Sequence, residues 1–310
     1  MKIVFMGTPE FSVPILEALD QTYEVVLVVT QPDKLVGRKK ELTPSPVKKY
    51  ALEHNIEVFQ PEKIRKDYQT ILDKKPDLIV TAAYGQIVGE KLLNAPTYKA
   101  INVHGSLLPK HRGGAPIQRA IINGDEVTGI TIMYMVKQMD AGDILAQKEI
   151  KIEKDETSSS LFQKMSILGR DLLMEVIPNL VQGKITPIPQ DESLVTFSPN
   201  ILSEEEKFDF NQEAIVLERL CRGLLDEPGA YFNFLNYPDP QDKIKVFECH
   251  VSNKQHNTDV GKIISVEKKF FTISCGNHTA LDIYKVQPVG KKIMNASDFI
   301  NGGLKKYLKD

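Results

Sequence analysis

The chain has 310 residues, of which 42% are hydrophobic and 26% charged, with a formal net charge of −2 and a pI of about 6.3. This composition is typical of a globular protein with room for two domains, and it excludes a disordered or fibrous chain. The charge balance also excludes nucleic-acid binding through a uniformly positive surface, so any such contact needs local basic residues.

The cysteines and the apolar runs indicate the cellular compartment of the protein. Residues 3–6 are too short an apolar run for a signal peptide, and no run of about 18 apolar residues is present to cross a membrane. The three cysteines, Cys221, Cys249 and Cys275, are odd in number and have no C-x-x-C spacing. They read as buried or free thiols, with neither zinc nor a disulfide framework implied. We therefore expect a cytoplasmic protein without a metal.

The first part of the chain alternates short β-rich apolar runs with segments of helical periodicity, and a serine followed by proline at Ser45 and Pro46 is typical of a helix start. Such alternation predicts an α/β domain with a Rossmann-like, doubly wound and mostly parallel sheet. The predicted strands cover residues 2–6, 25–30, 78–81, 100–104, 129–136 and 144–152, and the predicted helices 13–19, 46–54, 64–74, 86–93 and 157–181.

Composition changes after the long helix, which Gly183 is expected to end. Residues 184–206 contain three prolines, little periodicity and an acidic end, which is typical of an extended linker. A helix then follows at 211–225, and short strands are predicted at 243–251, 261–265, 270–274 and 281–286. Several short strands at this spacing suggest a small β-barrel. We expect an N-terminal domain at 1–183, the linker at 184–206 and a C-terminal domain at 207–310.

Three polar residues in the first domain can support chemistry. Asn102 and His104 lie two apart at the end of an apolar run, so on a strand both side chains face the same side. Asp140 returns between the last two predicted strands. An amide donor, a base and a carboxylate that orients the base are enough to stabilise an oxyanion and accept a proton, with no covalent nucleophile.

Each of the three also has a purely structural explanation. Asn102 could cap a turn, His104 could be a half-buried ring, and Asp140 could belong to the Asp-Ala-Gly-Asp bend. Their clustering favours a site, because the loop after His104 is rich in glycine and proline and follows the carboxyl end of a strand, where open α/β sheets bind ligands. These loop residues are Gly105, Pro109, Gly113, Gly114 and Pro116.

The sequence around these residues resembles the folate-dependent formyltransferases. The shared stretches read N-V-H-G-S-L-L-P-K-H-R-G-G-A-P-I-Q-R-A and M-D-A-G-D-I-L. Three further stretches resemble the bacterial branch whose acceptor is methionyl-tRNA, and together the match covers essentially the whole chain. They read M-K-I-V-F-M-G-T-P-E-F-S-V-P, T-Q-P-D-K-L-V-G-R-K-K-E-L-T-P-S-P-V-K and Q-D-E-S-L-V-T-F-S-P.

The resemblance implies transfer of the formyl group of 10-formyltetrahydrofolate to the α-amino group of methionine on initiator methionyl-tRNA, for initiation of protein synthesis. It implies a C-terminal barrel similar to an oligonucleotide-binding (OB) fold that binds tRNA, a protein that is generally a single chain, and catalytic roles for Asn102, His104 and Asp140. It also implies a folate pocket lined by Ser106, Leu107, Leu108 and Pro109.

Residues 34–40 form a basic segment that composition alone describes as a solvated surface loop. By resemblance, this segment enters the tRNA acceptor stem, with contacts from Arg38, Lys39 and Lys40. Arginine suits this role because its planar fork matches phosphates and base edges. The first predicted turn, at residues 7–10, has a single glycine where a dinucleotide fingerprint needs three, which argues against a nicotinamide enzyme.

Two other function classes stay open from the sequence. A folate-dependent formyltransferase acting on a small amine, such as an amino sugar nucleotide or glycinamide ribonucleotide, would share the same three polar residues, but the basic segment and the C-terminal domain argue against it. A non-enzymatic RNA-binding module would leave the three residues unexplained. The sequence does not decide whether Arg112 and Arg119 form ion pairs or contact an anion, and His111 is assigned no catalytic role.

Overall fold

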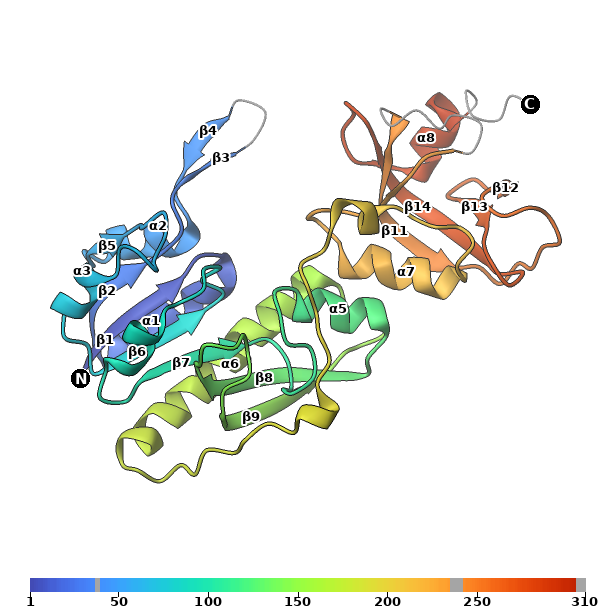
Figure 1. Ribbon diagram of the computed structural model, residues 1–310. Coiled ribbons are helices and arrows are strands. Elements are labelled where there is room, and N and C mark those ends of the chain that lie inside the picture. The colour runs from blue at the N-terminus through green and yellow to red at the C-terminus, as the bar shows by residue number, and fades with distance from the viewer. Residues whose placement is uncertain (37–39, 235–241, 305–310) are drawn as a thin grey trace. The chain divides into compact units, whose positions relative to one another are not determined.

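The computed structural model describes residues 1–36, 40–234 and 242–304 (Figure 1). Contacts within the chain divide it into two compact units, which we call the first and second units. The first unit comprises residues 1–116, 127–151 and 162–199, and the second comprises 117–126, 152–161 and 200–310. No helix in the described part of the chain is long and apolar enough to cross a membrane.

The first unit is built on a seven-stranded sheet with the order β5-β2-β1-β6-β7-β8-β9. Its strands are β1 (Lys2–Gly7), β2 (Glu24–Val29), β5 (Val58–Phe59), β6 (Leu78–Ala82), β7 (Ala100–His104), β8 (Val127–Tyr134) and β9 (Ile144–Lys151). Pairing is parallel from β5 to β7, and antiparallel between β7, β8 and β9. The predicted mostly parallel sheet is confirmed, with an antiparallel edge.

Helices cover both faces of this sheet. They are α1 (Val13–Thr22), α2 (Pro46–Glu53), α3 (Gln69–Asp73), α4 (Glu90–Asn94) and α6 (Ser158–Val181), the last of which begins in the second unit. On one face, Val4 of β1 shares an apolar cluster with Ile71 of α3 and Leu92 of α4. On the other, α6 approaches β7 so closely that a Cβ at Gly169 would lie 2.9 Å from Cγ1 of Val103. The sheet is therefore doubly wound.

Local sequence explains several helix ends. The Ser45 hydroxyl accepts a hydrogen bond from the backbone N–H of Lys48 at 3.1 Å, and Pro46 opens α2, as predicted. Gly183, with φ +66°, follows the end of α6. The helices expected at 64–74 and 86–93 are shorter, covering α3 and α4 only, and in the second case Gly85 at φ +86° and the cap residue Gly89 delay the start.

A small hairpin replaces part of the basic loop expected at residues 34–40. Strand β3 (Lys34–Val36) pairs antiparallel with β4 (Glu41–Thr43), and Leu35 lies opposite Leu42. The expectation of a loop is thus wrong for residues 34–36, because the charge run hid the matching apolar positions on either side of the turn. Both leucines are exposed, by 64% and 66%.

The second unit has an antiparallel sheet with the strand order β10-β11-β14-β13-β12, and β15 pairs with β14. The strands are β10 (Tyr231–Phe232), β11 (Ile244–Val251), β12 (Ile263–Val266), β13 (Phe271–Ser274), β14 (Ala280–Pro288) and β15 (Met294–Asn295). Its helices are α5 (Pro116–Asn123), whose first residue belongs to the first unit, α7 (Ala214–Gly223) and α8 (Ala296–Gly302). The small β-rich C-terminal domain is confirmed.

Within the second unit, two arginines connect its short segments 117–126 and 152–161 to the C-terminal part of the chain. Arg119 of α5 pairs with Glu205 at 2.7 Å. Arg222 of α7 donates to the backbone carbonyl of Glu156 at 2.7 Å and pairs with Glu218. These contacts explain why residues 117–126 and 152–161 group with the C-terminal segment. The linear limits at 183 and 207 stay a prediction.

The extended segment after α6 is tied to the first unit along its length. Ile188 exchanges two backbone hydrogen bonds with Ile144 of β9, and Arg112 receives one from Ser198 and donates one to Thr196. Extended residues held in this way can place side chains next to the strand ends. The segment therefore contributes to the surroundings of the candidate site.

Candidate active site

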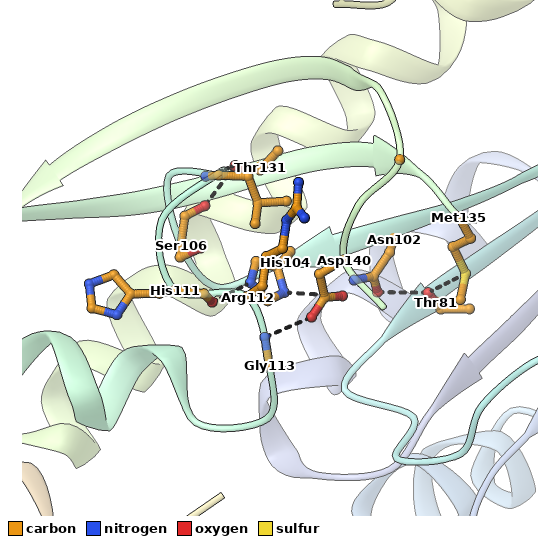
Figure 2. Close-up of polar contacts among 12 residues, drawn as sticks. Thr81, Asn102, His104, Ser106, His111, Arg112, Gly113, Thr131, Met135 and Asp140 are labelled. Atoms are coloured by element: carbon orange, nitrogen blue, oxygen red, sulfur yellow. Dashed lines mark hydrogen bonds and ion pairs between the residues drawn. The ribbon is translucent and has the colours of Figure 1, made fainter. Parts of the chain in front are cut away.

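The candidate site lies at the carboxyl end of β7, where the sequence placed it. His104 is the last residue of that strand, Asn102 precedes it on the same face, and Asp140 comes from the loop between β8 and β9. Figure 2 shows Asp140 between the two, with one carboxylate oxygen 3.8 Å from Nδ1 of His104. The structure thus brings the three predicted residues together.

Asn102 presents an amide donor to this site. The Thr81 hydroxyl, on the neighbouring strand β6, donates to Oδ1 of Asn102 at 2.7 Å. In this arrangement the carbonyl end of the amide faces β6, and its NH2 group points away from β6. No hydrogen bond joins that NH2 group to another residue in the described part of the chain. It is available for a negative oxygen.

A backbone carbonyl selects the tautomer of the neutral His104 ring. Nε2 lies 3.0 Å from the carbonyl oxygen of His111, and since a carbonyl only accepts, Nε2 carries the hydrogen. Nδ1 then holds the lone pair and faces Asp140. The Asp140 carboxylate was expected to orient this base, whereas the tautomer is selected by the His111 carbonyl. The carboxylate is placed to stabilise the ring once Nδ1 has taken a proton.

Asp140 is held by its loop in a conformation that few residues adopt. Its φ is +53°, in the left-handed region that aspartate tolerates better than most side chains. Its Oδ2 accepts a hydrogen bond from the backbone N–H of Gly113 at 2.9 Å. Two residues on, a Cβ at Gly142 would lie 1.8 Å from the carbonyl oxygen of Tyr134, so this turn requires glycine. Unusual backbone geometry of this kind is concentrated at functional sites.

The His111 side chain takes no part in this arrangement. Its Nδ1 lies 2.7 Å from the Ser198 hydroxyl, and its backbone N–H donates to the Thr196 hydroxyl at 2.9 Å. Figure 2 shows its ring directed away from His104. The contact of His111 with His104 is thus made by its backbone carbonyl. Sequence reasoning had no signal for it.

The stretch predicted to line a folate pocket is fastened to β8 and β9 by two polar side chains. The Thr131 hydroxyl donates to the Ser106 carbonyl at 2.7 Å and accepts from the Leu108 N–H at 3.1 Å. Gln147 donates to the Leu108 carbonyl at 2.8 Å. The Leu108 side chain is buried with Met133 and Ile144. The accessible side chains of the stretch are those of Leu107 and Pro109.

Two of the three residues predicted to contact tRNA are not among the described residues. Arg38 and Lys39 fall outside the described residues, and Lys40 is exposed at the end of the hairpin turn with φ +50°. The structure therefore places one of the three on the surface.

The two arginines that the sequence left undecided both form ion pairs. Arg112 is 1% exposed and makes a two-pronged contact with Glu192 at 2.8 and 3.2 Å. The hydrogen bonds from this guanidinium lower the pKa of the Glu192 carboxyl. Arg119 likewise lowers the pKa of Glu205 in the second unit. Neither guanidinium is left as an open anion contact at the site.

The three cysteines are free and buried, as expected. Burial raises the pKa of the Cys275 thiol to about 12, so it stays protonated and unreactive near neutral pH. Among the described residues, no group of three His, Cys, Asp or Glu side chains could hold a metal ion.

Comparison with known families agrees with this geometry. The formyl transferase family matches residues 1–177, and the formyl transferase C-terminal domain matches residues 200–304. The chain belongs to the formyl transferase family.

Curated relatives narrow the class. The chain is 49% identical to the methionyl-tRNA formyltransferase of Lactiplantibacillus plantarum, over 98% of this chain and 96% of that one. It is also 49% identical to the enzyme of the same name from Enterococcus faecalis, over 97% and 96%. At these identities over nearly full length, the chain lies among the methionyl-tRNA formyltransferases of that family.

Solved structures with similar folds include more distant formyltransferases. An N-formyltransferase from Helicobacter canadensis, in complex with folinic acid and dTDP-3-aminofucose, superposes with a TM-score of 0.69 at 17% identity, over 93% of this chain and 99% of that one. HypX from Aquifex aeolicus with tetrahydrofolic acid gives 0.65 at 16% identity, over 100% of this chain and 48% of that one. At these identities the likeness concerns the fold.

Proposed function

We propose that this protein transfers the formyl group of 10-formyltetrahydrofolate to the α-amino group of methionine on initiator methionyl-tRNA. The observation that carries the proposal is the open amide donor of Asn102 beside His104 and Asp140 at one strand end. The names of relatives that match nearly the whole chain support methionyl-tRNA as the acceptor. The modified tRNA would serve initiation of protein synthesis.

The acceptor amine needs a base. An α-amino group has an ordinary pKa of roughly 8, so its unprotonated form is readily populated near neutral pH. As it attacks the formyl carbon, its nitrogen must lose a proton. Nδ1 of His104 holds a lone pair for that proton, and Asp140, 3.8 Å away, stabilises the charged ring that results.

The attacked carbonyl oxygen needs a donor. Negative charge collects on it as the amine adds to the formyl carbon, and a preorganised donor in a partly dry site stabilises this charge. The NH2 group of Asn102 is such a donor, because Thr81 already occupies the carbonyl end of the amide. A direct attack by the amine explains why no serine or cysteine nucleophile is required.

The folate carrier holds the formyl group on its N10 nitrogen. Once the amine has added, the bond between the formyl carbon and N10 breaks, and N10 takes up the proton that His104 accepted, so tetrahydrofolate leaves. Residues 106–109 suit a flat, partly polar ring, since Leu107 and Pro109 offer apolar surface beside a backbone that Thr131 and Gln147 hold rigid. Fixing the backbone before binding reduces the cost of ordering it. This rigidity supports the stretch as a binding wall.

The tRNA is proposed to contact the basic segment at residues 34–40 and the C-terminal domain. Strand β3 at 34–36 pairs with β4 at 41–43, and Lys40, next to β4, is exposed. An acceptor the size of a tRNA needs contacts well beyond the residues that carry out the transfer. A small amine needs no such distant contacts. The proposed acceptor therefore accounts for more of the chain than the small-amine alternative does.

Formyl transfer to defined acceptors tests the proposal. The purified protein is incubated with 10-formyltetrahydrofolate and either initiator methionyl-tRNA, elongator methionyl-tRNA or a dTDP-amino sugar, and the formylated product is measured. We expect formylmethionyl-tRNA from the initiator and little product from the other two. Formylation of the sugar alone would replace the proposed acceptor. The Asn102→Ala variant controls for transfer without the enzyme's site.

A further inference from the structure

Gln190 links the two loops that carry the candidate site. Its Nε2 donates to the backbone carbonyls of Asp140 and Gly142 at 2.9 and 2.8 Å. Its Oε1 accepts from Nε and Nη2 of Arg112 at 3.0 and 2.8 Å. All four hydrogen-bonding positions of this amide are therefore occupied.

The chemistry of the partners fixes which way the amide points. A guanidinium has only donors and a carbonyl has only an acceptor, so Oε1 must face Arg112 and the NH2 group must face the Asp140 loop. No flipped amide can satisfy both sides. Glutamine is thus the side chain that fits, because glutamate lacks the donor and leucine or methionine lacks both functions.

Three consecutive residues after β7 act on the site through different groups. The carbonyl of His111 holds the His104 ring, the side chain of Arg112 holds Gln190, and the N–H of Gly113 holds the Asp140 carboxylate. Arg112 is itself anchored by Glu192, two residues after Gln190. The His104 side and the Asp140 side are in this way braced against one another.

We propose that Gln190 is a positioning residue, which sets the distance between the Asp140 carboxylate and His104 by holding the Asp140 loop to Arg112. This inference builds on the proposed formyl transfer, because it assigns a use to the positioned carboxylate. The Asp140 backbone has φ +53°, a conformation that its neighbours must maintain. Two hydrogen bonds to the carbonyls at Asp140 and Gly142 hold that turn in place.

Substitutions at Gln190 separate the two ends of the link. Gln190→Glu keeps an acceptor for Arg112 but turns a carboxylate oxygen toward two carbonyls, and Gln190→Met removes both links without adding charge. For both variants we expect kcat to fall by about tenfold or more, while the KM values for folate and tRNA stay within about twofold of wild type. This is the pattern expected when the reacting groups are displaced but the substrates still bind. Asp191→Asn is the matched control one residue away, since Asp191 is exposed and bonds Ser193.

A double-mutant cycle distinguishes positioning from general damage. If Gln190 acts through the Asp140 carboxylate, adding Gln190→Glu to Asp140→Asn should cause no loss beyond about twofold. An equal loss in both backgrounds, or a Gln190→Glu enzyme within about threefold of wild-type kcat, would overturn the inference. Melting temperatures of all variants show whether the fold is kept.

The Gly113 amide gives a readout that needs no activity. Its hydrogen bond to Asp140 moves the amide proton resonance downfield in a nitrogen-15 labelled protein. Gln190→Met should shift this resonance in the same direction as Asp140→Ala, while Asp191→Asn leaves it in place. An unmoved Gly113 resonance contradicts the positioning role, even if the wild-type protein formylates no tRNA and the proposed function itself fails.

Discussion

The hydroxyl oxygen of Thr81 lies 2.7 Å from Oδ1 of Asn102, and the two residues are direct partners in the β6 and β7 pairing. In the structure, this contact turns the NH2 end of the Asn102 amide toward the candidate site. A valine in place of Thr81 keeps the shape of the side chain but frees the amide to turn. The donor that the reaction needs would then be present only part of the time.

We therefore expect Thr81→Val to lower kcat by roughly three- to tenfold, the scale of about 1 kcal/mol for one buried hydrogen bond. Thr81→Ser keeps the hydroxyl and should restore most of the loss. Steady-state kinetics with methionyl-tRNA measures both. Full activity in Thr81→Val would show that the amide is oriented by other contacts.

The two histidines near the site should respond very differently to substitution. His104→Ala, Asn102→Ala and Asp140→Ala should each reduce turnover by about a hundredfold or more, the usual effect of losing a general base or an oxyanion donor. His111→Asn should cost less than about threefold, because the backbone carbonyl that holds His104 remains and asparagine tolerates the φ of +61° at this position.

Single-turnover formylation by these variants, with circular dichroism to check folding, measures the difference. If His111→Asn were as damaging as His104→Ala, a catalytic role for the second ring would follow. Near wild-type turnover in a folded His104→Ala protein would remove the proposed base.

A bulky charge in the stretch at 106–109 should affect folate more than tRNA. Leu107 is half-buried beside the rigid backbone of this stretch, so Leu107→Arg should raise the apparent folate constant while leaving the tRNA constant within about twofold. Leu52→Arg, on the exposed side of α2, is a matched control. An unchanged folate constant would move the pocket away from this stretch.

Much of the fold, and the placement of Asn102 and His104 on one face of a strand, followed from local patterns. Strands β6 and β7 were readable because parallel strands buried on both faces are nearly continuous apolar runs. Asn102 and His104 were placed together by the two-residue repeat of a strand. The prediction succeeded where the determining contacts are close in sequence.

The residues that hold the three polar side chains in place could not be predicted, because their contacts join parts of the chain that are distant in sequence. Gln190 lies 50 residues beyond Asp140 and 78 beyond Arg112 along the chain, and its role depends on how an extended segment folds back. The His104 tautomer depends on a backbone carbonyl, which every residue possesses. The pairing of β3 with β4 was hidden because charged residues crowd this part of the sequence, although Leu35 pairs with Leu42.

Acid should weaken the protein partly through Glu192. Hydrogen bonds from Arg112 lower its pKa in the folded chain, so the unfolded chain takes up a proton first as the pH falls. The resulting stability is fully present above the ordinary glutamate pKa of about 4.3 and is lost as the pH drops through the lowered value. When the pH is lowered from 6 into the acid range, the melting temperature of Glu192→Gln should therefore fall less than that of the wild type. Parallel melting curves with pH would contradict this.

Lys39 and Lys40 should contribute to tRNA binding as simple charges. The chain has a net charge of −2, so local contacts must supply the attraction to phosphate. Neutral substitution of Lys39 or Lys40 should weaken binding modestly and reduce the slope of log affinity against log salt by roughly one charge each. Filter binding at several salt concentrations measures this slope. No change in slope would leave these lysines as solvated surface.

Arg38 should behave as more than a charge. A guanidinium presents a planar fork that can contact a phosphate and a base edge together, which an ammonium cannot imitate. If Arg38 meets the acceptor stem in this way, Arg38→Lys should already lose most of the activity lost in Arg38→Ala, although the charge is kept. Folate binding should stay intact in both variants, because the predicted folate stretch lies elsewhere in the chain. The measurement is formylation of methionyl-tRNA at subsaturating tRNA and physiological salt. Equal rates for wild type and Arg38→Ala would show that this segment makes no specific contact with the tRNA.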